Sequence, residues 1–312
     1  MNIKIILHVM PWEIDQALMT VDKLKRSIYH IDPTDKIYID TVLNLSSAII
    51  DWDKSELPEK YFIKKYKLIE NLLGEPFIHH PYIYRGVGIY GHLNLQKSCI
   101  EEHIDAYIGI CPDIDFSEHL LYYLIESAKQ VEDKYFVITP QIFKSWDSSW
   151  DILVNDKFKD IPYEKCIDID IHEINHNCSD LETPTLSKMN QFKFAGWFDL
   201  FNKNFYEKLV PVLDEWNGYG PWDLYSMNVC EIAKHNKVNV NQYLLKNQVI
   251  WFNDVGCLRN MINYGDDGQY KLLYKQFLSL KVGRQEQRSH IDQNLNLYLN
   301  KWVEYAKLKN II

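Results

Sequence analysis

The first forty residues carry a strand–helix–strand pattern, which constrains the fold more than any other feature of the chain. The apolar run Lys4–Val9 predicts a buried strand, and Pro11-Trp12-Glu13 ends it. Apolar residues then recur at helical spacing from Ile14 to Ile28, and Lys36–Asp40 predicts a second strand. Such a unit strongly favours parallel strands with a right-handed crossover. We therefore expect an α/β protein whose ligand site lies beyond the carboxyl ends of its strands.

Composition narrows the class of protein. The 312 residues suffice for one large domain, or for one domain with an appendage. A formal charge of −9 argues against broad nonspecific binding to nucleic acid or to an anionic membrane. The six cysteines are scattered without a Cys-x-x-Cys pair, the apolar start is short for a signal peptide, and no stretch reaches a membrane-spanning length. We expect a cytoplasmic protein with reduced thiols.

The segment Asp113-Ile114-Asp115 is the main candidate for chemistry. It follows a predicted buried strand, Tyr107–Cys111, and precedes an amphipathic helix pattern. Two carboxylates at a strand end repel each other, and desolvation raises their pKa values unless a cation compensates. Mg²⁺ and Mn²⁺ prefer carboxylate oxygens, so a divalent metal is one solution. The alternative is a turn in which Asp115 or Ser117 caps the next helix.

Other patterns resemble ligand sites less specifically. A second Asp-x-Asp, at Asp168 and Asp170 with His172 beyond it, also follows from the alternation of a half-exposed strand. A predicted loop, Gly74–Pro81, carries His79 and His80, and histidines adjacent in sequence usually point apart.

Further elements are predicted from the local pattern. They are a helix over Tyr61–Leu73, a glycine-rich segment Arg85–Asn94, a helix Leu93–His103, a strand Tyr135–Thr139 ended by Pro140, helices Asn204–Leu213 and Leu224–Lys234, and a short strand Val249–Phe252.

The order of these segments resembles that of GT-A-type nucleotide-sugar glycosyltransferases, with a layout similar to the family 2 group. The resemblance spans roughly the first three-quarters of the chain and rests on several short motifs in the right order. It implies a mixed, mainly parallel sheet flanked by helices. Residues 1–258 would form the catalytic domain, with a nucleotide-sugar half (1–130) and an acceptor half (131–258). Residues 259–312 would form a helical C-terminal extension.

The resemblance also implies roles for individual residues. Those expected at the donor are Pro11, Trp12, Glu13, Asp40, Asn94, Asp113 and Asp115. Of these, Asp40 would end the second strand and contact the uracil or ribose, while Asp113 and Asp115 would hold Mn²⁺ or Mg²⁺, with Asp115 as the direct ligand. Those expected on the acceptor side are Gly196, Trp197 and Trp222. Asp223 would be the catalytic base.

The sequence departs from the family pattern in three places. The second strand continues as Asp40-Thr41-Val42 rather than with an Asp-Asp-Gly-Ser turn, and Trp222 replaces the acid that usually precedes the catalytic base. A third metal ligand has two loose candidates, His235 and His290.

The expected function is metal-dependent transfer of a sugar from a nucleotide-diphosphate sugar, UDP-sugar above all, to an acceptor hydroxyl. A saccharide is the default acceptor. A modified DNA base is an alternative, with a basic surface from Lys271, Lys275, Lys281, Arg284 and Arg288. From other classes, a metal-dependent phosphoesterase or a noncatalytic nucleotide- or sugar-binding protein remains open.

Overall fold

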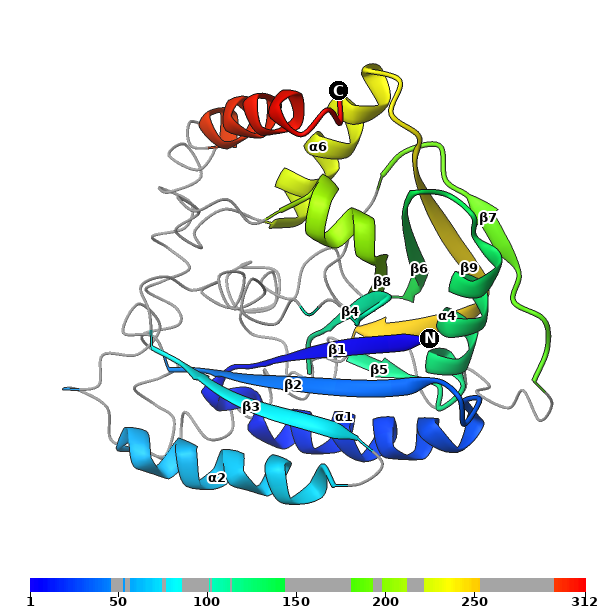
Figure 1. Ribbon diagram of the computed structural model, residues 1–312. Helices are drawn as coiled ribbons and strands as arrows, with labels where there is room; N and C mark the ends of the chain where they lie inside the picture. Colours follow the sequence, from blue (N-terminus) through cyan, green and yellow to red (C-terminus); the bar gives the residue numbers. More distant parts are fainter. Residues whose placement is uncertain are drawn as a thin grey trace, which may run out of the picture.

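A computed structural model describes residues 1–45, 53, 57–74, 77–85, 101, 103–112, 114–143, 181–192, 198–211, 222–252 and 295–312 (Figure 1). Within these ranges, the description leaves out the side chains at positions 12, 142, 143, 222–224, 251 and 252.

The described strands form one nine-stranded mixed sheet, and the α/β class predicted from the sequence is confirmed. Its order is β3-β2-β1-β4-β8-β6-β9-β5, and β7 pairs with β9 outside this path. The strands are β1 (Asn2–Val9), β2 (Lys36–Asn44), β3 (Ile78–Tyr84), β4 (Ala106–Ile110), β5 (Ile114–Phe116), β6 (Tyr135–Phe143), β7 (Leu186–Lys188), β8 (Phe198–Asn202) and β9 (Val240–Phe252). The helices are η1 (Pro11–Glu13), α1 (Ile14–Ser27), η2 (Ile28–His30), α2 (Glu59–Leu72), α4 (Leu120–Gln130), a π-helical turn η6 (Phe205–Leu209) and α6 (Trp222–His235).

The N-terminal strand–helix–strand unit is confirmed. β1 pairs in parallel with β2 on one side and with β4 on the other, and β2 pairs in parallel with β3. Side chains alternate across β1, so that Ile5 packs into one core and Ile6 into the other. The remaining strands join through the antiparallel pairs β4–β8 and β8–β6 and the parallel pair β6–β9.

Helices cover both faces of the sheet (Figure 1). The core on one face contains side chains of α1, α2 and α4, whereas the core on the other contains side chains of η6, α6 and a C-terminal helix over residues 295–308. Trp302 of this last helix is fully buried, and its Nε1–H donates to the carbonyl oxygen of Leu209 over 2.6 Å. The described part of the expected C-terminal extension is thus mainly helical and packs into the core that it shares with η6 and α6, while a boundary at residue 258 stays a prediction.

Several predicted boundaries were wrong, for physical reasons. The predicted loop containing His79 and His80 is the edge strand β3, whose polar side chains find partners on β2. β6 continues past Pro140, and the register against β9 shifts there, as expected where a residue lacks a backbone N–H. The predicted helix Asn204–Leu213 is the shorter turn η6, and the predicted strand Val249–Phe252 is the end of the much longer β9. No helix in the described ranges is long and apolar enough to cross a membrane.

Candidate functional site

The carboxyl ends of β1, β2, β3 and β4 meet at one edge of the sheet, because these neighbouring strands are parallel. From β1 the chain moves outward through β2 to β3, and it then returns to the other side of β1 as β4. The strand order therefore reverses between β1 and β4. In open α/β sheets, ligands bind in the crevice beyond the strand ends at such a switch point.

The segment after β1 forms one side of this crevice. Pro11 is buried at the start of η1, and Glu13 folds back so that its Oε2 accepts the backbone N–H of Met10 over 3.0 Å. α1 begins immediately afterwards, at Ile14. Glu13 thus shapes the turn that leads from β1 into α1, and a contact of Pro11, Trp12 or Glu13 with a donor stays a prediction.

Asp40 does not end its strand, which corrects the sequence-based placement. β2 continues through Thr41 and Val42 to Asn44, and the Asp40 side chain has no exposed surface. Its Oδ2 lies 3.1 Å from Lys4 Nζ, and its Oδ1 lies 3.2 Å from Nδ1 of His80 on β3. The continuous apolar run after Asp40 carries the strand four residues further, so Asn44 occupies the end position that was assigned to Asp40.

Lys4 is a buried cation that lies beside Asp40. Its Nζ also donates to Glu101 Oε1 over 2.5 Å. Burial alone would lower the pKa of Lys4, but the hydrogen bonds and negative charges of Glu101 and Asp40 raise it above its usual value. The hydrogen bond from Lys4 in turn lowers the pKa of Glu101. Asp40 therefore belongs to a buried charge network, which leaves it poorly placed to contact a ligand.

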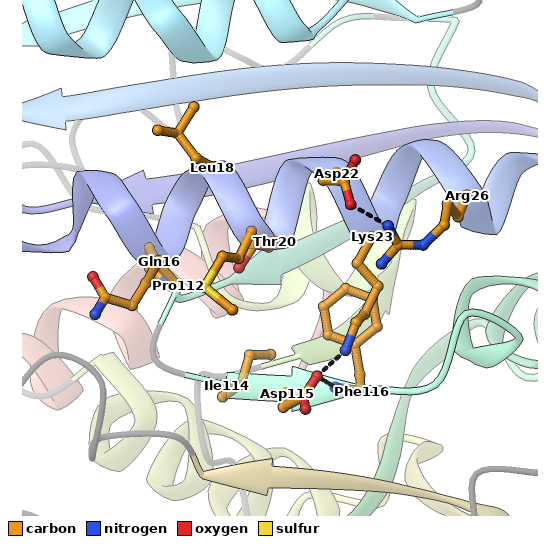
Figure 2. A pocket seen from close by; sticks show the side chains of 11 residues that line it. Gln16, Leu18, Thr20, Asp22, Lys23, Arg26, Pro112, Ile114, Asp115 and Phe116 are labelled. Atoms are coloured by element: carbon orange, nitrogen blue, oxygen red, sulfur yellow. Dashed lines mark hydrogen bonds and ion pairs between the residues drawn. The ribbon is translucent and has the colours of Figure 1, made fainter.

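Asp115 lies inside β5, not in a turn after β4. β5 pairs antiparallel with the end of β9, with Asp115 opposite Trp251. The Asp115 Oδ1 forms an ion pair with Lys23 Nζ of α1 and accepts the backbone N–H of Phe116 over 2.8 Å (Figure 2). The expected helix cap is not Asp115, although Ser117 Oγ accepts the N–H of His119 over 3.2 Å just before α4.

A pocket of about 490 Å³ lies between α1 and the segment Pro112–Phe116. Figure 2 shows the side chains of Gln16, Thr20 and Lys23 on the α1 side and Ile114 and Asp115 on the β5 side. The Lys23–Asp115 pair bridges the two sides.

The described residues do not form a metal site on their own. Across the described ranges, no group of three or more His, Cys, Asp or Glu lies together as metal ligation requires. Asp115 shares its carboxylate with Lys23, and His235 is exposed at the last position of α6. Asp113 lies outside the described residues, so its role as a ligand stays a prediction.

Other predicted site residues also fall outside the description. They are Asn94, Gly196, Trp197, Asp168, Asp170, His172 and His290. Trp222 and Asp223 open α6, but their side chains are not described.

The residues that sequence reasoning missed are the cations Lys4 and Lys23. Lys4 had a signal, because a lysine inside the apolar run Ile3–Val9 must find a partner when it is buried. Lys23 had none, since a lysine on the polar side of a helix pattern is ordinary.

No protein-family model matches the chain, and no curated protein matches its sequence. Several solved structures are distantly similar. The crystal structure of GalNAc-T7 with UDP, GalNAc and Mn²⁺ aligns with 80% of this chain at 10% identity and a TM-score of 0.40, and this chain covers 43% of it. S. aureus TarS 1-349 aligns with 90% of the chain at 9% identity and a TM-score of 0.40, with 71% of TarS covered. A mycobacterial protein aligns with 80% at 8% identity and a TM-score of 0.38, with 66% covered. At these TM-scores the likeness supports no conclusion about function.

Proposed function

We propose that this protein is a GT-A-type glycosyltransferase that moves a sugar from a nucleotide-diphosphate sugar, with UDP-sugar as the expected donor, to an acceptor hydroxyl. The observation that carries the proposal is the switch point between β1 and β4. The turn Pro11–Glu13 follows β1 there, and Cys111-Pro112-Asp113 follows β4. Nucleotides bind at such crevices in doubly wound sheets.

Asp113 is the residue that we propose as the metal anchor. It is three residues beyond Ile110, the last residue of β4, and its carboxylate oxygens are the ligand type that Mg²⁺ and Mn²⁺ prefer. When bound, such a cation neutralises the diphosphate and favours its departure. Asp115 stays the second proposed ligand, with its Oδ1 paired with Lys23.

Asp223 is the proposed general base. It stands at the second residue of α6, where the helix dipole favours a carboxylate anion. From there it would take the proton of the acceptor hydroxyl. We expect Asp223→Asn to lower turnover by about 10²–10⁴-fold while UDP binding is kept, since general-base catalysis contributes about that much. Turnover is measured as UDP release, and binding by calorimetry. Weaker UDP binding with turnover unchanged at saturating donor would contradict the base role.

A saccharide is the acceptor that we favour, and the rival chemistry is phosphoester hydrolysis. Incubation with UDP-sugars and Mn²⁺, followed by separate assays of UDP and UMP, distinguishes them. Transfer or slow hydrolysis of the sugar releases UDP. A phosphoesterase that cleaves the donor diphosphate would instead release UMP and a sugar 1-phosphate, and UDP release only when DNA is present would identify a base-modifying enzyme.

A further inference from the structure

We propose that the pocket between α1 and β5 binds a neutral saccharide ring, and that the side chain of Gln16 forms the hydrogen bonds that hold this ring. The pocket would be a second ligand site, beside the nucleotide crevice at the ends of β1 and β4. Of the residues proposed above for the donor and the acceptor, Asp115 alone is among the described residues that line it. Binding there requires neither a nucleotide nor a metal, so the inference goes beyond the proposed function.

The walls of the pocket suit a ligand with an apolar face. Its volume of about 490 Å³ lies within the range of about 300–1,000 Å³ that is typical of small-molecule sites. Met19 of α1 and, on the opposite side, Pro112 and Ile114 supply apolar lining. Met19 is 68% exposed, so a ligand that covers it removes apolar surface from water. One face of a sugar ring carries C–H groups that pack against such a surface.

The Oε1 atom of Gln16 is a buried acceptor that needs a donor. Gln16 is 6% exposed, and no described residue donates a hydrogen bond to this atom. The side chain leaves α1 on the side where β5 lies, and it lines the pocket (Figure 2). A buried acceptor without a donor destabilises the fold, so a ligand hydroxyl that donates to Oε1 would supply the missing bond. The side-chain amide also offers N–H donors, and neighbouring hydroxyls of a sugar match it because each can donate and accept.

The charged side chains of the pocket are already paired, which favours an uncharged ligand. Lys23 pairs with Asp115, and Arg26 pairs with Asp22 (Figure 2). An anion such as phosphate would have to compete with these carboxylates for both cations. Gln16 and Lys23 are seven positions apart on α1, a rise of about 10 Å, so the amide lies away from the Lys23–Asp115 pair. A neutral ring with several hydroxyls satisfies the amide and disturbs neither ion pair.

NMR of the whole protein, with isotope-labelled methionine methyl groups, tests the proposal at the pocket itself. Glucose, galactose, mannose and N-acetylglucosamine are titrated separately, without UDP or metal. We expect at least one of them to shift the Met19 methyl signal to saturation, and the variant Met19→Leu assigns this signal. The signal of Met227, which packs against the core on the other face of the sheet, should not move.

Two glutamine variants test the role of the amide. Gln16→Leu keeps a side chain of similar size and removes the amide, so we expect the saccharide affinity measured at Met19 to fall by about tenfold. Gln248→Leu is the matched control. Gln248 is 4% exposed and its Oε1 likewise has no donor among the described residues, but it lies on β9 and does not line the pocket. This control should keep the wild-type affinity, and an unchanged Met227 signal in each variant shows that the fold is kept.

Three results would overturn the proposal. They are a wild-type Met19 signal that none of the saccharides shifts, a wild-type affinity in Gln16→Leu, and a response to sodium phosphate but to none of the saccharides, which would identify an anion site. The wild-type titration decides whether the site exists even if Gln16→Leu does not fold. The transferase assays monitor UDP, so the proposed function and this inference can fail separately.

Discussion

Lys4 has no exposed side-chain surface, yet it stands in the middle of β1 among residues that fill the core. A buried ammonium is tolerated only when partners replace its water, and here Asp40 and Glu101 do so from two other segments of the chain. The same contacts explain why Asp40 is structural. Its carboxylate balances the positive charge of Lys4. Both side chains are buried on the face of the sheet that packs against α6 and the C-terminal helix.

Replacing Lys4 alone should destabilise the fold more than replacing Lys4 and Asp40 together. We expect Lys4→Met to lower the free energy of unfolding by about 3–5 kcal/mol, because it leaves the buried Asp40 without its cation. The double variant Lys4→Met/Asp40→Leu should recover much of that loss, since two apolar side chains need no compensation. Urea denaturation measures both values. A double variant less stable than Lys4→Met would contradict the buried-pair interpretation.

The Lys4–Glu101 contact also predicts a pH dependence. The pKa of Glu101 is lower in the folded protein, so this contact stabilises the fold above the unfolded pKa and stops doing so as the pH falls through the folded pKa. The pKa of Lys4 is raised, so its contribution is complete below the unfolded pKa and is lost as the pH rises through the folded one. Wild type and Glu101→Gln should therefore differ in stability near neutral pH and converge as the pH falls below the folded pKa of Glu101, which lies below its usual value. An equal difference at all acidic pH values would contradict the ion pair.

For single residues, the sequence indicated which side chains need a partner better than it indicated which residues those partners are. A lysine inside the apolar run Ile3–Val9 needs a buried partner. The sequence predicts Asp40 at a strand end, in contact with a ligand, because it places the end of β2 four residues too early. The Lys23–Asp115 pair joins residues 92 positions apart. A single sequence carries no signal for such a contact, because the pairing depends on how β5 folds back beside α1.

Elements with a clear period were predicted well. β1, α1 and α2 have apolar residues at the spacing of their structures, and their positions agree with the sequence within a few residues. β3 was missed because His79, His80 and Pro81 interrupt its apolar pattern. These residues are tolerated because β3 is an edge strand, where His79 Nε2 lies 2.9 Å from Thr41 Oγ1 and burial lowers the pKa of His79.

The C-terminal helix gives a prediction at this scale. Trp302 fills the core beside η6, and its indole N–H satisfies the carbonyl of Leu209. We expect Trp302→Ala to lower the free energy of unfolding by about 3–5 kcal/mol, the usual cost of removing a buried Trp side chain. Trp302→Phe should cost less, because it keeps most of the packing and loses the hydrogen bond. Denaturant unfolding measures both, and a neutral effect of Trp302→Ala would show that this helix does not stabilise the domain.

For the whole molecule, the sequence predicted which strand ends share an edge of the sheet, but not the order of the strands. The apolar runs placed Pro11–Glu13 and Asp113 at strand ends, and parallel pairing puts those ends at one edge. Only the fold reveals that β1 and β4 are neighbours, so that the strand order reverses between them. Strand order depends on pairings between distant segments, to which local patterns contribute little.

The most direct test of the central claim is calorimetry of UDP binding with and without Mn²⁺, in the wild type, Asp113→Asn and Asp105→Asn. Asp105 is the control because it lies at the other end of β4, where its Oδ2 accepts the N–H of Asn2 over 2.8 Å. We predict that Mn²⁺ strengthens UDP binding in the wild type and in Asp105→Asn but not in Asp113→Asn. UDP binding that ignores Mn²⁺ in the wild type, or that responds to it equally in Asp113→Asn, would contradict a metal-assisted nucleotide site between β1 and β4.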